Sequence, residues 1–249
     1  ADLHSSLPAV LAGLRSPDSQ EQPRVAYIMT DGGALPLAYS RVVAALSQAG
    51  WLTGTITAGQ AWGGDIEAVS VHNALLAARH VLRADAAVVI QGPGNLGTET
   101  PWGFSGVACG DAINAIATLG GHPVACLRVS DADPRARHRG VSHHSMTAYG
   151  RVALAGADVV VPGLEGPLGV QVRREAEALC APRPGAGQHR LVEVPADGLL
   201  ELLRKAEAQT GVRLSTMRRG LDEDAAAFIA AAAAGCYARR ILNEGTAHG

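Results

Sequence analysis

Short apolar segments alternate with segments of helical periodicity along the whole chain, and this alternation constrains the fold more than any other feature. The apolar segments are 24–30, 51–58, 86–91, 122–130, 157–163 and 189–195. Strands of a parallel sheet are buried on both faces, so they consist almost entirely of apolar residues, and helices connect them. The sequence therefore predicts an α/β fold with a doubly wound, mostly parallel sheet of about six or seven strands and helices on both faces.

The size and charge of the chain narrow its class further. Its 249 residues suit a single α/β domain over 1–249, in which 181–188 is a surface loop and the weaker alternative boundary. A formal net charge of −2 gives no general attraction to nucleic acid or to an anionic membrane. We therefore expect a cytoplasmic protein that binds neither.

One apolar stretch near the end of the sequence is rich in alanine. Residues 225–238 read AAAFIAAAAAGCYA, which is too short to cross a bilayer. Such a helix is expected to be buried or to face another subunit. On this ground we predict a homo-oligomer.

Unusual residues gather in the loops that follow the predicted strands. Ligands of parallel sheets bind beyond the carboxyl ends of the strands, where these loops lie. The four candidate loops are 30–36, 58–65, 91–100 and 130–145. A ligand site at this end of the sheet is therefore expected.

The loop at 91–100 contains the spacing G-x-G-x-x-G. It suits a dinucleotide site, a smaller anion or substrate site, or a purely structural turn. A dinucleotide site is weakened because the loop follows the third predicted strand and Thr100 and Pro101 are expected to start the helix only later. The candidate substrate-binding residues here are Gly92, Gly94, Asn95, Gly97 and Thr98.

The loop at 130–145 reads SDADPRARHRGVSHHS and mixes carboxylates, guanidinium groups and imidazoles. A divalent metal ion is the candidate cofactor, and its candidate ligands are Asp131, Asp133, His138 and His144. The candidate residues for clamping an anion are Arg135, Arg137 and Arg139. The alternative is a solvated charged loop in which Ser142 caps the next helix.

Candidate catalytic residues come from two of these loops. They are Asp31, Asp131 and His143. Asp31 follows a strand directly and is a ligand, a base, a ribose acceptor or the cap of a turn. Adjacent residues of a helix point in different directions, so at most one of His143 and His144 is expected to face a shared site.

The loops also resemble a known family. YIMTDGGALPLAYSR, QGPGNLGTETPWGFSGVACGDAIN and LRVSDADPRARHRGVSHHSMTAYGRVAL are similar to DUF3866, a family of uncharacterised bacterial proteins. The resemblance is dense over 1–165 and looser beyond. It implies the family's α/β region without the β-rich segment that precedes it in other members, and it implies no reaction.

Three functions remain open at this point. The first is an enzyme that acts on a small phosphate- or carboxylate-bearing molecule by hydrolysis or group transfer. The second is a nucleotide- or dinucleotide-binding protein, in which Asp31 or Asp131 contacts a ribose. The third is a noncatalytic structural or assembly protein, which uses the alanine-rich helix.

Overall fold

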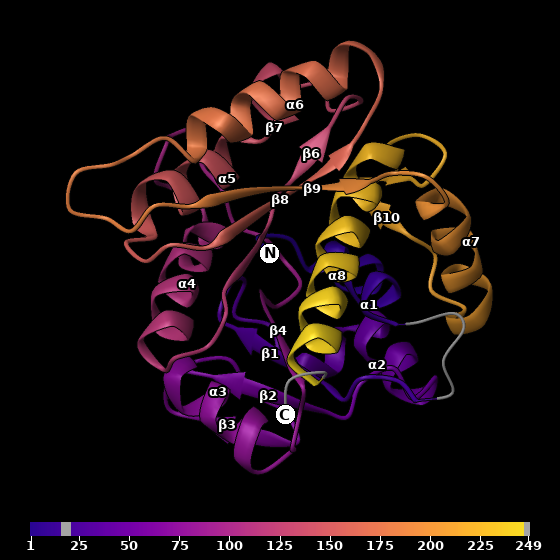
Figure 1. Cartoon of the computed structure of the whole chain (residues 1–249). Coiled ribbons are helices and arrows are strands. Elements are labelled where there is room, and N and C mark those ends of the chain that lie inside the picture. Colours follow the sequence, from indigo (N-terminus) through magenta and orange to yellow (C-terminus); the bar gives the residue numbers. More distant parts are fainter. Residues whose placement is uncertain (16–20, 247–249) are drawn as a thin grey trace.

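The computed structural model describes residues 1–15 and 21–246 (Figure 1). Within these residues the parallel strands form a four-stranded sheet, β3-β2-β1-β4, and a three-stranded sheet, β5-β8-β9. The bounds are β1 Val25–Thr30, β2 Gly54–Ala58, β3 Ile66–Ala68, β4 Ala86–Gln91, β5 Val124–Cys126, β8 Asp158–Gly163 and β9 Arg190–Pro195. The predicted α/β class and the parallel pairing are confirmed. A single sheet of six or seven strands is not observed in the described residues.

Helices cover the four-stranded sheet on both faces. The helices are α1 Leu7–Leu14, α2 Arg41–Gln48, α3 Val71–His80, α4 Ala108–Thr118, α5 His143–Thr147, α6 Gly166–Leu179, α7 Leu199–Thr210 and α8 Ala225–Thr246. Side chains alternate across a strand, so Tyr27 and Met29 join the core beside α1, α2 and α8, whereas Ala26 and Ile28 join the core beside α3. All six residues of β1 are buried. The strand is therefore central, as its apolar sequence predicts.

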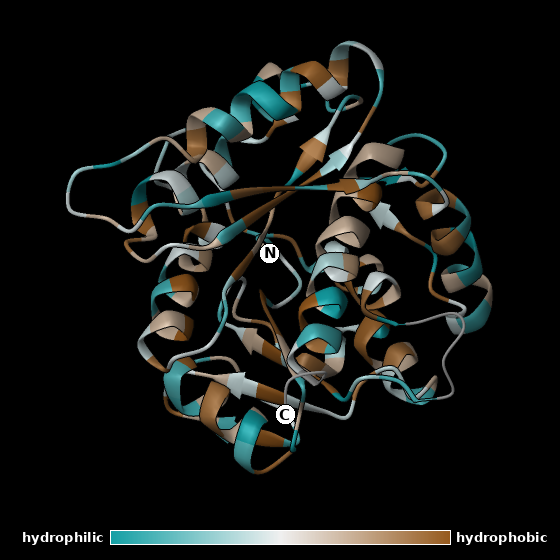
Figure 2. Cartoon of the chain, in the orientation of Figure 1, coloured by the Kyte–Doolittle hydropathy of each residue, from teal (hydrophilic) through white to brown (hydrophobic). Residues whose placement is uncertain are grey.

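The three-stranded sheet is covered in the same way. Val159 and Val161 of β8 pack in a core with α4 and α6, and Val160 packs on the opposite face with α8. α6 shows alternating teal and brown in Figure 2, and its buried residues are Val172, Ala176 and Leu179. This spacing of four and three gives the helix one apolar face toward the sheet.

The alanine-rich helix α8 contacts the three-stranded sheet and lies against α1 (Figure 1). A Cβ on Gly13 would meet the carbonyl oxygen of Ala232, and a Cβ on Gly235 would meet that of Val10. The two helix backbones therefore touch, and the small residues serve this packing. By length and composition α8 could cross a membrane, but half of its most apolar window is buried inside the protein. Its apolar face is used within the chain, so it gives no support to the predicted homo-oligomer.

Gly235→Ala is expected to destabilise the protein by about 1–3 kcal/mol, because the new methyl group meets the α1 backbone and the helices must move apart. Gly245→Ala is the matched control on the same helix, since no atom lies within 4 Å of the corresponding Cβ. Urea unfolding of both variants measures the difference. Equal midpoints for Gly235→Ala and the wild type would contradict the close contact.

The periodicity of residues 66–83 predicts a single helix with Asp65 as its cap, but the structure differs. Ile66–Ala68 is the edge strand β3, and α3 begins only at Val71, where Ser70 accepts a hydrogen bond from the amide of Asn73 at 3.2 Å. Asp65 was expected to cap that helix. Its carboxylate instead accepts bonds from the amide and the hydroxyl of Thr55, both at 2.8 Å, and so stabilises the start of β2.

Two short antiparallel ladders complete the fold. β6 Val129–Ser130 pairs with β7 Gly140–Val141, and β10 Ser215–Thr216 pairs with β11 Arg219–Gly220. The first ladder closes the base of the loop at 130–145. The charged loop predicted from sequence is therefore held at both ends.

Candidate functional site

Three imidazole rings meet in the closed loop and at the start of α5. The ring centroids lie 4.8 Å apart for His138 and His143, 4.9 Å for His138 and His144, and 4.4 Å for His143 and His144. One nitrogen of each ring lies within 4.8 Å of those of the other two. Within residues 1–15 and 21–246, no other three side chains of metal-ligating type gather as closely. We call these three residues the His cluster.

The expectation that at most one of His143 and His144 faces a shared site is wrong. Both stand in the first turn of α5, and His138 reaches this turn from the short 3-10 turn Ala136–His138. The ring of His138 contacts the rings of both His143 and His144. The two histidines of α5 point in different directions from the helix, and they still share this third ring. Ser142 caps the helix, as in the alternative considered for this loop, because its hydroxyl accepts the amide of His144 at 3.2 Å.

Polar groups hold two of the rings through their Nδ1 atoms. Ser142 Oγ lies 2.8 Å from Nδ1 of His138. For His144, Nδ1 lies 3.7 Å from a carboxylate oxygen of Asp2 and 3.5 Å from Nη1 of Arg128. Arg128 only donates, so a bond to it uses the lone pair of Nδ1 of His144, whereas a bond to Asp2 uses a proton there. When Nδ1 of each ring carries the proton and faces Ser142 or Asp2, the lone pair of Nε2 is available for a ligand in both rings.

The ring of His143 lacks a hydrogen-bond partner for one of its nitrogens. Nε2 of His143 is buried and has no hydrogen-bond partner, and the same holds for Oδ2 of Asp2. Buried polar atoms without a partner are uncommon and costly, so they often mark a place for an ion or ligand. The His cluster therefore contains a nitrogen that the protein itself does not satisfy.

Burial and nearby charge keep two of the imidazoles neutral. Burial, aided by the positive charges of Arg128 and Arg135, lowers the pKa of His138 to about 3. Burial, followed by the influence of His144 and Arg137, lowers the pKa of His143 to about 4. Neutral imidazole is the form that binds a metal ion.

Asp133 lies beside the cluster and is fully buried, but its carboxylate is occupied by guanidinium groups. Arg135 donates two bonds to it at 2.9 Å, Arg219 lies at 3.2 Å and Arg128 at 3.5 Å. Although burial alone raises its pKa, the hydrogen bonds and charge of Arg135 outweigh this and hold the pKa of Asp133 well below its usual range. The carboxylate of Asp133 is therefore used in ion pairs with arginine side chains.

The predicted anion-binding arginines fall into two groups. Arg135 is used by Asp133, and Nε of Arg139 donates to the backbone carbonyl of Asp133 at 2.9 Å. The structure records no hydrogen bond or ion pair for the exposed side chain of Arg137 within the described residues. Of the three, Arg137 is the one whose charge is not already used by the fold.

Two predicted catalytic carboxylates lie outside the His cluster. Asp31 is exposed and accepts the amide of Ala34 at 3.3 Å, which is the turn-cap alternative considered from sequence. Asp131 is exposed, and no partner of its side chain is recorded in the described residues. A catalytic role for either remains a prediction.

The glycine-rich loop closes on itself and carries an aromatic ring to the site. Asn95 accepts a bond from the hydroxyl of Ser105 at 2.8 Å, and Thr98 bonds Thr100 at 2.8 Å. A bridge between Gly97 and Phe104 completes the turn. The ring of Phe104 stacks on His144 at 3.8 Å, with 2° between the planes.

The helix expected at 101–119 is shorter, because α4 begins at Ala108. The hydroxyl of Thr100 accepts the amide of Gly103 at 3.1 Å instead of capping that helix. The glycines therefore do not lead directly into a helix N-terminus, as a dinucleotide loop does. Binding of substrate by Gly92, Gly94, Asn95, Gly97 and Thr98 remains a prediction.

Comparison with protein families adds one finding. The model of DUF3866, described as a protein of unknown function, matches residues 1–235. The chain belongs to the DUF3866 family. The match to DUF3866 includes Asp2, the glycine-rich loop, the His cluster and part of α8, so it extends well past the region of dense resemblance noted in the sequence. No curated protein and no solved structure matches the chain.

Sequence reasoning missed several residues at this DUF3866 site. Asp2 precedes the first helix and carries no motif. Arg128 interrupts an otherwise apolar segment, and a charge in such a segment is a signal of a buried ion pair that could have been used. Arg219 and Asp224 bond each other at 2.9 Å and lie far along the chain from the loop at 130–145, so only the fold brings them here.

Proposed function

We propose that the protein is a metal-dependent enzyme that acts on a small anionic molecule by hydrolysis or group transfer. The observation that carries this proposal is the His cluster, in which a buried Nε2 of His143 lacks a partner. The proposed metal ligands are His138, His143 and His144. This set replaces the carboxylates Asp131 and Asp133 of the sequence-based prediction with a third imidazole.

The His cluster fits a transition-metal ion of the zinc type. Zn–N bonds of roughly 2.0–2.1 Å in a tetrahedral site place the nitrogens about 3.4 Å apart. The ligand nitrogens lie within 4.8 Å of one another. Side-chain rotations that move them by about 1–1.5 Å would bring them to the spacing of a tetrahedral site. Imidazole ligands suit Zn²⁺, Co²⁺ or Ni²⁺ better than Mg²⁺ or Ca²⁺, which prefer oxygen.

Three protein ligands leave a position open, which is typical of catalytic rather than structural zinc sites. An ion of this kind lowers the pKa of a bound water to about 7 and polarises a phosphoryl or carbonyl oxygen. The exposed Arg137, whose charge contributes to the low pKa of His143, is the group that we propose binds the substrate anion. Phe104 covers one face of His144 and limits the access of bulk water to that side of the site.

The test is metal analysis of the purified protein with matched histidine variants. We expect close to one equivalent of a transition metal in the wild type after loading with Zn²⁺ and dialysis. His143→Ala should lose nearly all of it, because two imidazoles alone bind weakly. His80→Ala, which changes an exposed histidine on α3, should retain the metal in full.

A second variant distinguishes the set of three imidazole ligands from the ligand set with carboxylates that was predicted from sequence. Asp131→Asn leaves the His cluster intact and should keep its metal, whereas loss of metal in this variant would contradict the three-imidazole site. Circular dichroism confirms that each variant is folded. A wild type that stays metal-free after loading would overturn the metal-dependent function.

A further inference from the structure

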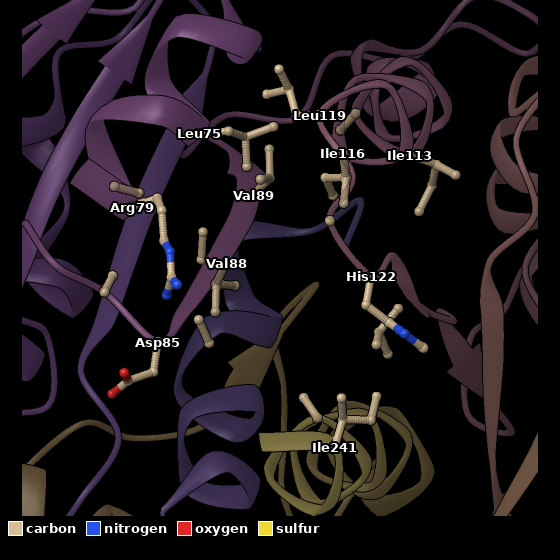
Figure 3. Close-up of a pocket in the computed structure, with 18 of the residues that line it drawn as sticks. Leu75, Arg79, Asp85, Val88, Val89, Ile113, Ile116, Leu119, His122 and Ile241 are labelled. Carbon is tan, nitrogen blue, oxygen red and sulfur yellow. The ribbon is translucent and has the colours of Figure 1, made fainter. Parts of the chain in front are cut away.

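An elongated cavity of about 540 Å³ lies between the two parallel sheets (Figure 3). The four consecutive residues Ala86–Val89 of β4 line one side, and Val124 and Cys126 of β5 also line it. Consecutive strand residues point to opposite faces, so a cavity that touches all four runs along the edge of β4 rather than over one face. We call this cavity the inter-sheet slot.

Helices close the slot above and below. Figure 3 shows Ile113 and Ile116 of α4 across from Val88 of β4, and Ile241 of α8 approaching from another side. The exposed polar side chains of the lining lie near the starts of β4 and β5, and they are Arg79, His80, Asp85 and His122. The slot is therefore apolar inside and open to solvent at the amino ends of these strands.

Both strand edges that border the slot lack a partner strand. β4 pairs only with β1, and β5 pairs only with β8, among the strands of the described residues. β4, α4 and β5 follow one another along the chain in the order of a βαβ unit, in which the two strands run in the same direction. Buried backbone N–H and C=O groups without partners are costly, so this arrangement calls for another strand.

Residues 1 and 2 already lie at the inner end of the slot. The backbone nitrogen of Ala1 is 3.2 Å from the carbonyl oxygen of Val89, and the carbonyl oxygen of Asp2 accepts a bond from Nε2 of Gln91 at 2.7 Å. Ala1 therefore lies beside the end of β4, and its own carbonyl oxygen accepts a bond from Sγ of Cys109 at 2.8 Å. A backbone that continues from Ala1 toward the open end would run beside β4 in parallel.

We propose that the inter-sheet slot holds a β-strand whose last residues are Ala1 and Asp2. This strand lies parallel to β4 and β5 and joins the sheets in the order β3-β2-β1-β4, new strand, β5-β8-β9. The predicted single doubly wound sheet is then restored, with more strands than expected. The inference is independent of the metal proposal.

A small apolar ligand is the alternative occupant, since the slot volume is within the range of about 300–1,000 Å³ that is usual for such sites. A ligand of that kind cannot pair two rows of main-chain groups, whereas a strand pairs both. The strand also accounts for the position of Asp2. It would bring this carboxylate to the carboxyl end of the central strand, within 3.7 Å of His144.

The test fuses a six-residue strand of valine and threonine directly to Ala1 of the full chain. We expect a higher thermal midpoint than that of the unfused chain, and amide hydrogen exchange about ten-fold slower or more at Ala87, Val89 and Val124. The matched control is the same fusion with proline at its second and fourth positions, which cannot donate the strand hydrogen bonds. This control should show neither effect.

Two outcomes would overturn the proposal. Equal exchange and equal thermal midpoints for the two fusions would show that the slot does not accept a strand. Protection of β4 and β5 by the same peptide added as a separate molecule, without protection in the fusion, would show that the occupant is not continuous with Ala1. Neither outcome changes the three imidazole ligands of the His cluster, so this test and that of the His cluster fail separately.

Discussion

Asp133→Asn is expected to lower the free energy of unfolding by about 3–5 kcal/mol, the usual cost of removing one partner from a buried ion pair. The fully buried carboxylate accepts bonds from Arg135 and contacts Arg219 and Arg128. An amide of the same shape leaves Arg135 without its counter-charge, whereas Arg219 keeps its bond to Asp224 at 2.9 Å. Urea unfolding at pH 7 measures the change.

The matched control for this prediction is Asp131→Asn, two positions away in the same loop. Its carboxylate is exposed, so its unfolding free energy should change by no more than about 0.5 kcal/mol. Similar losses in both variants would contradict a specific role for Asp133.

The pH dependence gives an independent check of the same carboxylate. The pKa of Asp133 is lowered in the folded protein, so its stabilising effect is complete above the unfolded pKa of about 3.9 and is lost as the pH falls toward the folded value. The stability gap between wild type and Asp133→Asn should therefore narrow below about pH 4. A gap that stays constant from pH 7 to pH 3 would show that the charge of Asp133 is not what stabilises the loop.

The class of the fold could be predicted from sequence, because burial on both faces imposes apolar residues at every position of a central strand. β1 and β8 show this pattern and were identified. The three-residue strand β3 was not, because Ile66–Ala68 also fits the helical pattern that continues into α3. The pairing of Ile66–Ala68 with β2 makes this segment a strand. A long-range contact of this kind has little effect on the sequence pattern of a short segment.

The sequence points to the loop at 130–145 more readily than to the contacts that its side chains make. The loop at 130–145 was chosen because titratable side chains follow a strand, and it holds the three histidines. The partners of each carboxylate could not be predicted, because Arg219 contacts Asp133 only when β11 and the loop fold together. The Asp-x-Asp spacing suggested a metal, whereas the arginines around Asp133 show that a nearby counter-charge can use the same carboxylate.

Asp2 offers the second large effect, on metal affinity. Its carboxylate oxygen lies 3.7 Å from Nδ1 of His144 and has no hydrogen bond of its own. A carboxylate in this place fixes the tautomer of a metal-bound imidazole and increases its basicity, and loss of such a group weakens binding by about 10–100-fold. We therefore expect Asp2→Asn to bind Zn²⁺ about 10–100-fold more weakly than the wild type, as measured by competition with a chromophoric chelator.

The outcome separates three roles for this carboxylate. Asp111→Asn, an exposed substitution on α4, is the control and should bind Zn²⁺ as the wild type does. Complete loss of metal from Asp2→Asn would make Asp2 a direct ligand, and unchanged affinity would exclude it from the site. The intermediate loss is expected when the oxygen of Asp2 accepts the proton of Nδ1 and Nε2 of the same ring binds the ion. Asp2 would then act through His144, and its placement at the end of the inter-sheet slot would connect the strand to the chemistry of the site.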